Sequence, residues 1–158
     1  MRIAITVGAA ALLVAAAASQ TGAKPKPAAR LLSAEQVVAA RQAGMGLSAG
    51  VLGSYKGAVD AGGEVKPFAF SSRQLVKWAN AIPSLFPAGT ALPGSEAKPS
   101  IWANRADFDA KAAAFAAAAT RLNDAAKAGD KEAFAAAFRD AGGACKGCHD
   151  LYRAEPAH

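Results

Sequence analysis

Apolar residues recur every three or four positions in several separate segments of this chain, which is the spacing of amphipathic helices. The first segment starts at Ser33, where Ser33-Ala34-Glu35-Gln36 matches a capping box with Ser33 as the N-cap. We expect this helix to end near Lys56–Gly57. The residues on its core face are Val38, Arg41, Met45, Leu52 and Tyr55.

A second helix is expected to begin after Ser71 or Ser72. Pro83 would kink or terminate this helix, and Pro87 would end it, because proline cannot donate the backbone hydrogen bond of a helix interior. A long loop from Pro87 to Pro99 follows, and loops of this length in compact domains tend to be functional. The apolar stripe of the helix is Leu75, Trp78, Ala79, Ile82 and Phe86.

Two further helices are predicted in the second half of the chain. One runs from Ile101 or Asn104 to Lys127 and is stopped by Gly129. The other begins after Asp130, which is a good N-cap residue. The chain shows no strand pattern and no internal repeat. Four amphipathic helices with one long connection therefore predict an all-α fold, an antiparallel four-helix bundle.

The last predicted helix carries the most specific motif of the chain, Cys145-Lys146-Gly147-Cys148-His149. Two cysteines separated by two residues and followed at once by histidine form the attachment pattern of a c-type haem. The two thiols add to the two vinyl groups of the porphyrin, and the adjacent imidazole reaches the iron. We therefore expect one covalently bound haem c with its iron. The residues Phe134, Phe138, Ala141, Cys145, Cys148 and Tyr152 keep a spacing of four and three, which places both thiols on the core face.

Three other interpretations of the cysteines compete with haem attachment. A redox dithiol more often stands beside a strand in a βαβ fold, and no such strand is predicted. A structural zinc site usually has four ligands, whereas the chain has two cysteines and two histidines in all. A chance match is the third alternative, although the chain has no cysteine outside this motif.

Composition and charge change this picture little. Alanine is the most frequent residue, and aromatic residues make up 7%, which suits closely packed helices. The formal net charge is +6 at pH 7, but the basic residues are scattered, so no nucleic-acid partner is expected. A mildly basic protein that meets acidic partners is the simpler interpretation.

The N-terminus is predicted to be a secretory signal peptide. Arg2 is followed by an almost wholly apolar or small run from Ile3 to Ala18, and cleavage is expected after Ala18 or Ala23. The run is short for an anchoring helix, and no membrane span is expected in the mature chain. The expected division is a signal peptide at 1–23, an extended leader at 24–32 and a four-helix haem domain at 33–158.

Four glycines recur on one stripe of the first predicted helix: Gly46, Gly50, Gly53 and Gly57. Each interior glycine costs about 1 kcal/mol relative to alanine. The stripe therefore indicates a surface that another helix, a second subunit or the haem approaches closely. A weak, frayed helix end is the alternative.

Several motifs together resemble the cytochrome c′ family, the class II c-type cytochromes. They are Arg41-Gln42-Ala43-Gly44-Met45, Leu85-Phe86-Pro87-Ala88-Gly89-Thr90, Ile101-Trp102 and Cys145-Lys146-Gly147-Cys148-His149-Asp150-Leu151-Tyr152-Arg153. The resemblance covers about residues 33–153. It implies a four-helix bundle with the haem motif near the C-terminus, a periplasmic location, and a homodimer formed through the first two helices.

The resemblance also implies roles for individual residues. Cys145 and Cys148 would hold the haem, and His149 would be the proximal ligand of the iron. Arg41 and Gln42 correspond to the pair that meets the haem propionates, a contact that suits the fork of an arginine. A solvated helix arginine is the alternative for Arg41.

Four further positions take part in the resemblance. Arg153 corresponds to the basic residue beside the proximal histidine, where it affects solvent access and the charge near the iron. Otherwise it is a cation favoured by the C-terminal end of a helix. Phe86, Trp102 and Tyr152 are expected to line the haem pocket, and a core role alone would explain Phe86 and Trp102 equally well.

Met45 decides between two functions. In this family the residue four positions after the arginine lies over the open face of the iron. Ligation by methionine would make a six-coordinate, low-spin electron carrier, as in the cytochrome c-556 branch, with periplasmic redox proteins as partners. That is the expected function. The alternative is a five-coordinate protein that binds nitric oxide or another small gas, with Met45 acting in packing alone. No enzyme activity is expected, because no distal acid–base group is available.

Overall fold

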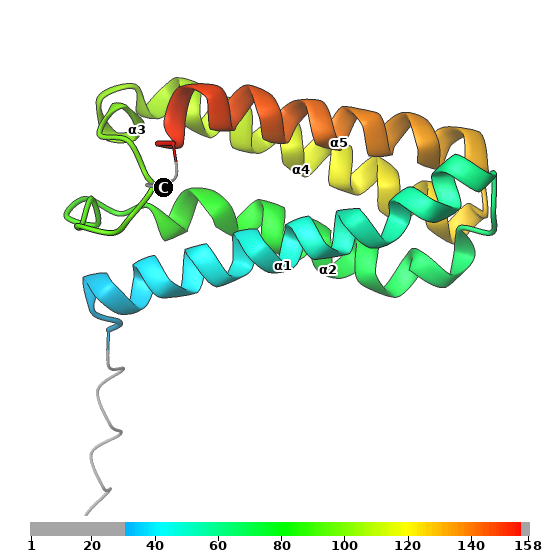
Figure 1. Ribbon diagram of the computed structural model, residues 1–158, viewed down its shortest axis with the longest axis horizontal. Helices are drawn as coiled ribbons and strands as arrows, with labels where there is room; N and C mark the ends of the chain where they lie inside the picture. The colour runs from blue at the N-terminus through cyan, green and yellow to red at the C-terminus, as the bar shows by residue number, and fades with distance from the viewer. Residues whose placement is uncertain (1–30, 156–158) are drawn as a thin grey trace, which may run out of the picture. The chain divides into compact units, whose positions relative to one another are not determined.

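The computed structural model describes residues 31–155, which form a bundle of α-helices (Figure 1). The helices are α1 (Ala34–Ala61), α2 (Ala69–Ala81), α3 (Ser100–Ala103), α4 (Arg105–Ala128) and α5 (Lys131–Tyr152), with 3₁₀ turns at Lys66–Phe68 and Ile82–Leu85. The predicted signal peptide and the leader as far as residue 30 lie outside the described residues. Within residues 31–155, no helix combines the length and the apolarity that crossing a membrane requires.

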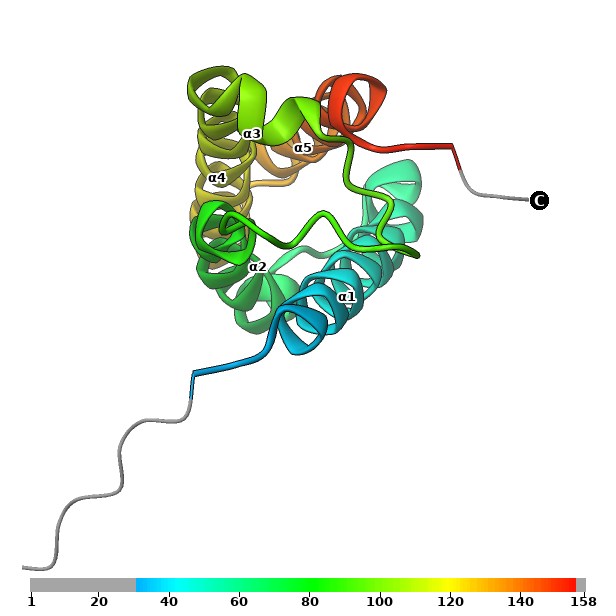
Figure 2. The same ribbon diagram turned by 90° about the vertical axis from the view of Figure 1, so that its left-hand side faces the viewer.

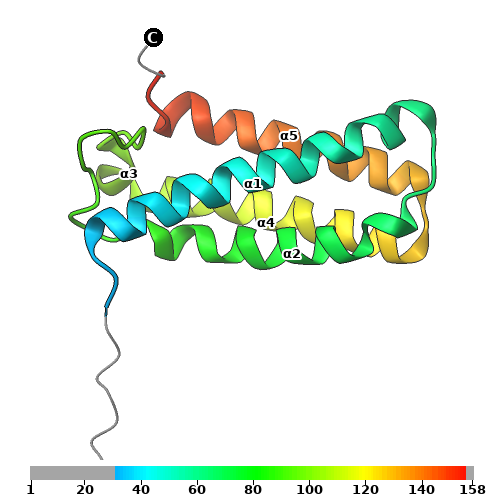
Figure 3. The same ribbon diagram turned by 60° about the horizontal axis from the view of Figure 1, so that its bottom comes forward.

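The four long helices confirm the predicted antiparallel four-helix bundle. Successive helices run in opposite directions (Figure 1), and they follow one another around the bundle in the order α1, α2, α4, α5 (Figure 2). α4 packs extensively against α5 and α2, whereas α1 packs much less extensively against α2 and α5. The loop between α2 and α4, which contains α3, covers one end of the bundle (Figure 3).

α1 is about one turn longer than its sequence pattern predicts. It begins as expected, because the Ser33 hydroxyl accepts a hydrogen bond from the Gln36 backbone and the Gln36 side chain accepts one from the Ser33 backbone. It runs on to Ala61, where the prediction ended it near Lys56–Gly57, and Gly62 caps it with a left-handed φ of 59°. The fully buried Tyr55 holds these last turns against the core.

The glycine stripe of α1 is not covered by another helix of the same chain. A β-carbon added at Gly46, Gly50, Gly53 or Gly57 would meet nothing within 4 Å. The expectation that a neighbouring helix lies close to this stripe is therefore wrong within residues 31–155. Gly46 instead lines the cavity described below.

The boundaries of α2 also differ from the prediction. α2 begins at Ala69 and not after Ser71 or Ser72, because the 3₁₀ turn Lys66–Phe68 leads directly into it. It ends at Ala81, and the chain continues as a 3₁₀ turn that contains Pro83. Proline is tolerated there because the first residues of a helical turn need no backbone donor.

The third predicted helix is divided at Asn104 into the short α3 and the long α4. The remaining caps follow the prediction. Gly129 ends α4 with a left-handed φ of 77°, and Asp130 caps α5 by accepting a hydrogen bond from the Ala133 backbone. Local cap chemistry therefore fixes the turn between these two helices.

The core has two distinct ends. At the end where α1 turns toward α2, Tyr55, Phe68 and Phe134 form an aromatic cluster in which the Tyr55 and Phe134 ring centroids are 5.2 Å apart. At the opposite end, Phe86 packs edge-on against Phe108 with a centroid separation of 4.8 Å. Phe86 and Phe108 face a cavity, whereas the aromatic cluster does not line it.

Candidate haem-binding site

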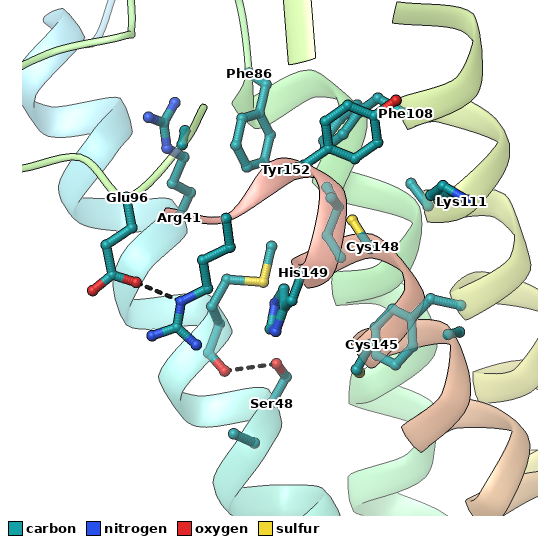
Figure 4. A pocket seen from close by; sticks show the side chains of 18 of the residues that line it. Arg41, Ser48, Phe86, Glu96, Phe108, Lys111, Cys145, Cys148, His149 and Tyr152 are labelled. Carbon is teal, nitrogen blue, oxygen red and sulfur yellow. Dashed lines mark hydrogen bonds and ion pairs between the residues drawn. The ribbon is translucent and has the colours of Figure 1, made fainter. Parts of the chain in front are cut away.

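A cavity of about 650 Å³ is bounded by α1, α4 and α5 (Figure 4). Its lining includes Cys145, Cys148 and His149, the three residues that the sequence motif singles out. The two cysteines lie one turn apart on α5, so both thiols face the same space. The prediction that the motif lies on the inner face of the last helix is therefore confirmed.

The walls of this cavity are mainly apolar. α4 contributes Phe108 and Phe115 to one side, and α1 contributes Leu52 to the other. Gly142 of α5 also lines the space, and a β-carbon there would meet nothing within 4 Å. A flat apolar macrocycle suits walls of this kind, because burying apolar surface is favourable and few polar groups have to be desolvated.

Both thiols are held in a partly buried, neutral state. Burial raises the pKa of Cys145 and, together with the neighbouring Cys145 sulfur, raises the pKa of Cys148, while Lys111 partly opposes the latter shift. The two cysteines are not joined by a disulfide. Within residues 31–155, no three His, Cys, Asp or Glu side chains converge on one point that could hold an ion, so the zinc alternative has no ligand set there.

The imidazole of His149 is kept neutral by its surroundings. Burial is the main cause of its lowered pKa, and the positive charge of Arg153 lowers the pKa further. The carboxylates of Glu96 and Asp150 act in the opposite direction. A neutral imidazole has a free nitrogen lone pair, which is what a metal ligand requires.

Arg41 is a buried cation at the edge of the cavity. Its guanidinium donates to the Leu85 carbonyl, the Thr90 hydroxyl, the Thr90 carbonyl and the Ser95 hydroxyl, the last at 2.6 Å. Among residues 31–155 it forms no ion pair with a carboxylate. Burial lowers the pKa of this group. A buried, unpaired positive charge that lines a cavity favours an anionic occupant, and haem propionates fit this requirement.

Gln42 and Met45 lie beside Arg41 on α1 and line the same cavity. Gln42 is exposed and donates to the Gly94 carbonyl at 3.1 Å. Met45 is partly buried against the core. Its carbonyl accepts a hydrogen bond from Ser48, which is also a lining residue (Figure 4). The structure therefore brings the two predicted iron ligands, Met45 and His149, to one cavity from different helices.

The three predicted aromatic residues have different positions. Phe86 and Tyr152 line the cavity, but Trp102 does not. The indole of Trp102 donates to the Phe86 carbonyl at 3.2 Å and to the Pro87 carbonyl at 3.0 Å. Its contribution is thus indirect, because these hydrogen bonds hold the chain segment that carries Phe86. The Tyr152 hydroxyl donates to Asp107 at 2.6 Å.

An ion pair between Glu96 and Arg153 lies at the edge of the cavity, where both residues belong to the lining (Figure 4). The Arg153 Nε atom is 2.6 Å from the Glu96 Oε2 atom. The sequence predicted a role for Arg153 but none for Glu96. Glu96 stands in the long loop after α2, and the length of that loop is the only sequence signal that pointed to it.

Known proteins resemble this chain over most of the described residues. Residues 36–153 match the family model described as Cytochrome C'. A cytochrome c′ from Rubrivivax gelatinosus is 50% identical over 60 residues, which are 38% of this chain and 46% of the relative. A cytochrome c-556 from Agrobacterium tumefaciens is 44% identical over 75 residues, which are 48% of this chain and 60% of the relative. The chain thus spans less than two thirds of the length of these two relatives.

Solved structures also resemble the bundle. The nitric oxide complex of a cytochrome c prime variant from Alcaligenes xylosoxidans superposes with a TM-score of 0.73 and a sequence identity of 30%. The match covers 80% of this chain and 100% of that chain. The similarity therefore extends over the whole bundle and includes the helices that carry the cavity residues.

Proposed function

This chain belongs to the cytochrome c′ family, whose members carry covalently attached haem c, and we propose that it binds nitric oxide or another small gas at the haem iron. The observation that carries the proposal is the cavity itself, which receives Cys145, Cys148 and His149 from α5 and Met45 from α1. When bound, haem would supply an iron that can take a small gas as a ligand, and His149 would hold that iron from α5.

The side chains of the cavity have separate tasks in this proposal. The thiols of Cys145 and Cys148 would fix the porphyrin to α5, and the neutral imidazole of His149 would ligate the iron. Arg41 provides the positive charge for a propionate. The burial of Cys145 and His149 and the hydrogen bonds of Arg41 support these assignments.

A small neutral gas suits the α1 side of the cavity. This wall is formed by Met45, Ala49 and Leu52, with Ser48 as a neutral polar group among them. None of the side chains that α1 contributes to it is a histidine or a carboxylic acid. Cleaving a bond in a ligand such as peroxide benefits from a group of that kind, so we propose ligand binding without turnover. The nitric oxide complex of the Alcaligenes xylosoxidans variant supports this choice.

A second candidate function is electron transfer with Met45 as the other iron ligand. It is favoured by the position of Met45, which lines the same cavity as His149, and by the similarity to a cytochrome c-556. Ligation by methionine and histidine suits electron transfer and raises the reduction potential. The two candidate functions differ only in whether Met45 ligates the iron and so prevents an added ligand from binding.

An absorption spectrum of the ferrous holoprotein with and without carbon monoxide tests the proposal. Gas binding predicts a carbon monoxide adduct in the wild type. M45L, which keeps a side chain of similar volume and removes the sulfur, should then leave the resting spectrum almost unchanged. A low-spin spectrum that ignores carbon monoxide, and that becomes high-spin in M45L, would instead establish the electron carrier.

We further propose that the chain is exported to the periplasm after removal of its signal peptide, where redox proteins are its partners. A homodimer through α1 and α2 is supported by the open space around Gly50 and Gly53 and by Leu47, which is 72% exposed. The mass of the secreted holoprotein tests cleavage, and its sedimentation tests the dimer. A single species with the mass of one chain in sedimentation would contradict the dimer.

A further inference from the structure

The loop segment from Ser95 to Lys98 is attached to the turn of α5 that follows His149. The Lys98 backbone donates to the Tyr152 carbonyl at 2.9 Å, and the Ala154 backbone donates to the Glu96 carbonyl at 2.7 Å. An isolated antiparallel bridge between Ala97 and Arg153 lies between these two bonds. The backbone of Glu96 therefore has a fixed place beside the end of α5.

The same segment is also attached to α1. The Ser95 hydroxyl accepts from the buried guanidinium of Arg41 at 2.6 Å and from the Ala97 backbone at 3.2 Å. The segment from Ser95 to Lys98 is thus held on two sides of the cavity. The carboxylate of Glu96 projects from this fixed segment to Arg153 at 2.6 Å (Figure 4).

Stability is a weak explanation for this ion pair. The side chains of Glu96 and Arg153 are 44% and 45% exposed, and exposed ion pairs contribute little to folding. A role in positioning Arg153 explains the ion pair better, because Glu96 and Arg153 line the cavity together with His149. A free arginine side chain would move among many rotamers, whereas this one is held by a carboxylate on a doubly attached segment.

We propose that Glu96 is a positioning residue that holds Arg153 at the edge of the cavity beside His149 and so sets the charge that the iron experiences from that side. The proposal rests on the attachment of haem. It does not depend on whether a gas or Met45 occupies the other side of the iron.

The midpoint potential of the holoprotein, measured by spectroelectrochemical titration without added ligand, tests this role. In E96Q the iron loses the negative charge of Glu96, which favours the reduced state, and Arg153 loses the carboxylate that fixes its side chain. We expect the midpoint potential of E96Q to shift upward. A small loss of folding stability in E96Q would not by itself raise the midpoint potential.

E64Q is the matched control. Glu64 forms an exposed ion pair with Lys131 at 2.7 Å, and its substitution removes the same charge. Lys131 precedes His149 by 18 positions on α5, which corresponds to roughly 27 Å along the helix. We expect the midpoint potential of E64Q to equal that of the wild type. Equal potentials in E96Q and E64Q would overturn the proposal.

A double variant shows whether Glu96 acts through Arg153. Residues that act through one another have non-additive effects. We expect the shift caused by E96Q in the wild type to differ at least twofold from its shift in an R153Q background, because only the former includes movement of the Arg153 charge. Equal shifts in the two backgrounds would mean that Glu96 acts by its own charge alone, and the positioning role would be wrong. The carbon monoxide spectrum tests the gas-binding proposal separately, since neither variant alters Met45 or His149.

Discussion

Gly44 of α1 lies directly against the indole ring of Trp78 in α2. A β-carbon at Gly44 would be 2.2 Å from the Cη2 atom of Trp78, a distance that two non-bonded carbon atoms do not tolerate. Gly44 therefore permits the close contact between α1 and α2 immediately before Met45. The other glycines of α1 that face open space make no such contact.

G44A is expected to destabilise the fold by about 1–3 kcal/mol, because the added methyl group forces the partly buried ring of Trp78 to move. G57A is the matched control in the same helix. A β-carbon at Gly57 meets nothing within 4 Å, so this substitution should raise stability by up to about 1 kcal/mol through helix propensity. Thermal unfolding of both variants checks the prediction, and equal melting temperatures would contradict it.

Arg41 is expected to be intolerant of lysine. R41K keeps the charge but loses the planar fork that donates to Thr90 and Ser95, and the cost should be about 2 kcal/mol. R73K is the control, since the guanidinium of Arg73 packs only on the exposed ring of Phe70. Urea unfolding of the two variants tests the difference. A midpoint in R41K as high as that in R73K would show that the hydrogen bonds of Arg41 are unimportant.

Alkaline pH is expected to weaken the attachment of α5 to α4. The hydrogen bond to Asp107 raises the pKa of Tyr152 from its ordinary value of 10.0 to about 12. The folded state therefore holds the phenolic proton more tightly than the unfolded state does. The stabilisation is complete below pH 10 and is lost as the pH rises toward 12.

The urea midpoint, measured at several pH values between 9 and 12, tests this dependence. The wild type should lose stability more steeply than Y152F over that interval. D107N should behave like Y152F, because the pKa of Tyr152 returns toward its ordinary value when the carboxylate is removed. Parallel curves for all three proteins would exclude the Tyr152–Asp107 pair as the cause.

Covalent haem is expected to require both cysteines. After denaturing electrophoresis, the wild type should retain haem staining, whereas C145A/C148A should lose it because no thioether can form. K146A changes the intervening exposed residue, whose side chain pairs only with Asp150, and should keep full staining. Stain that persists in the double cysteine variant would refute attachment at this motif.

The features that could be predicted from the sequence are local ones. The capping box at Ser33, the stop at Gly129 and the cap at Asp130 depend on residues within a few positions of one another. The haem motif is equally local, since five consecutive residues of one helix contain both thiols and the imidazole. The resemblance of the chain to a known family then predicted the residues of another helix that share the site with this motif, such as Arg41 and Met45.

The features that were missed depend on tertiary contacts. The cost of Gly57 suggested an early end to α1, but the burial of Tyr55 and the left-handed Gly62 carry the helix to Ala61. Propensity is a weak guide where packing opposes it. Glu96 could not be assigned because its partner, Arg153, is 57 positions away in sequence. The family resemblance predicts Trp102 in the pocket, whereas the hydrogen bonds of its indole nitrogen hold it outside the cavity lining.

The aromatic cluster of Tyr55, Phe68 and Phe134 gives the bundle an end whose cohesion does not involve the haem cavity. Proteins open in cooperative units, each with its own free energy. We expect the two ends of this bundle to open as separate units. Amide protons near the cluster should exchange slowly whether or not haem is attached, while those of α1 near Met45 should depend on the cofactor. We therefore expect the protein without haem to keep one ordered end, where the cluster joins α1, the turn Lys66–Phe68 and α5.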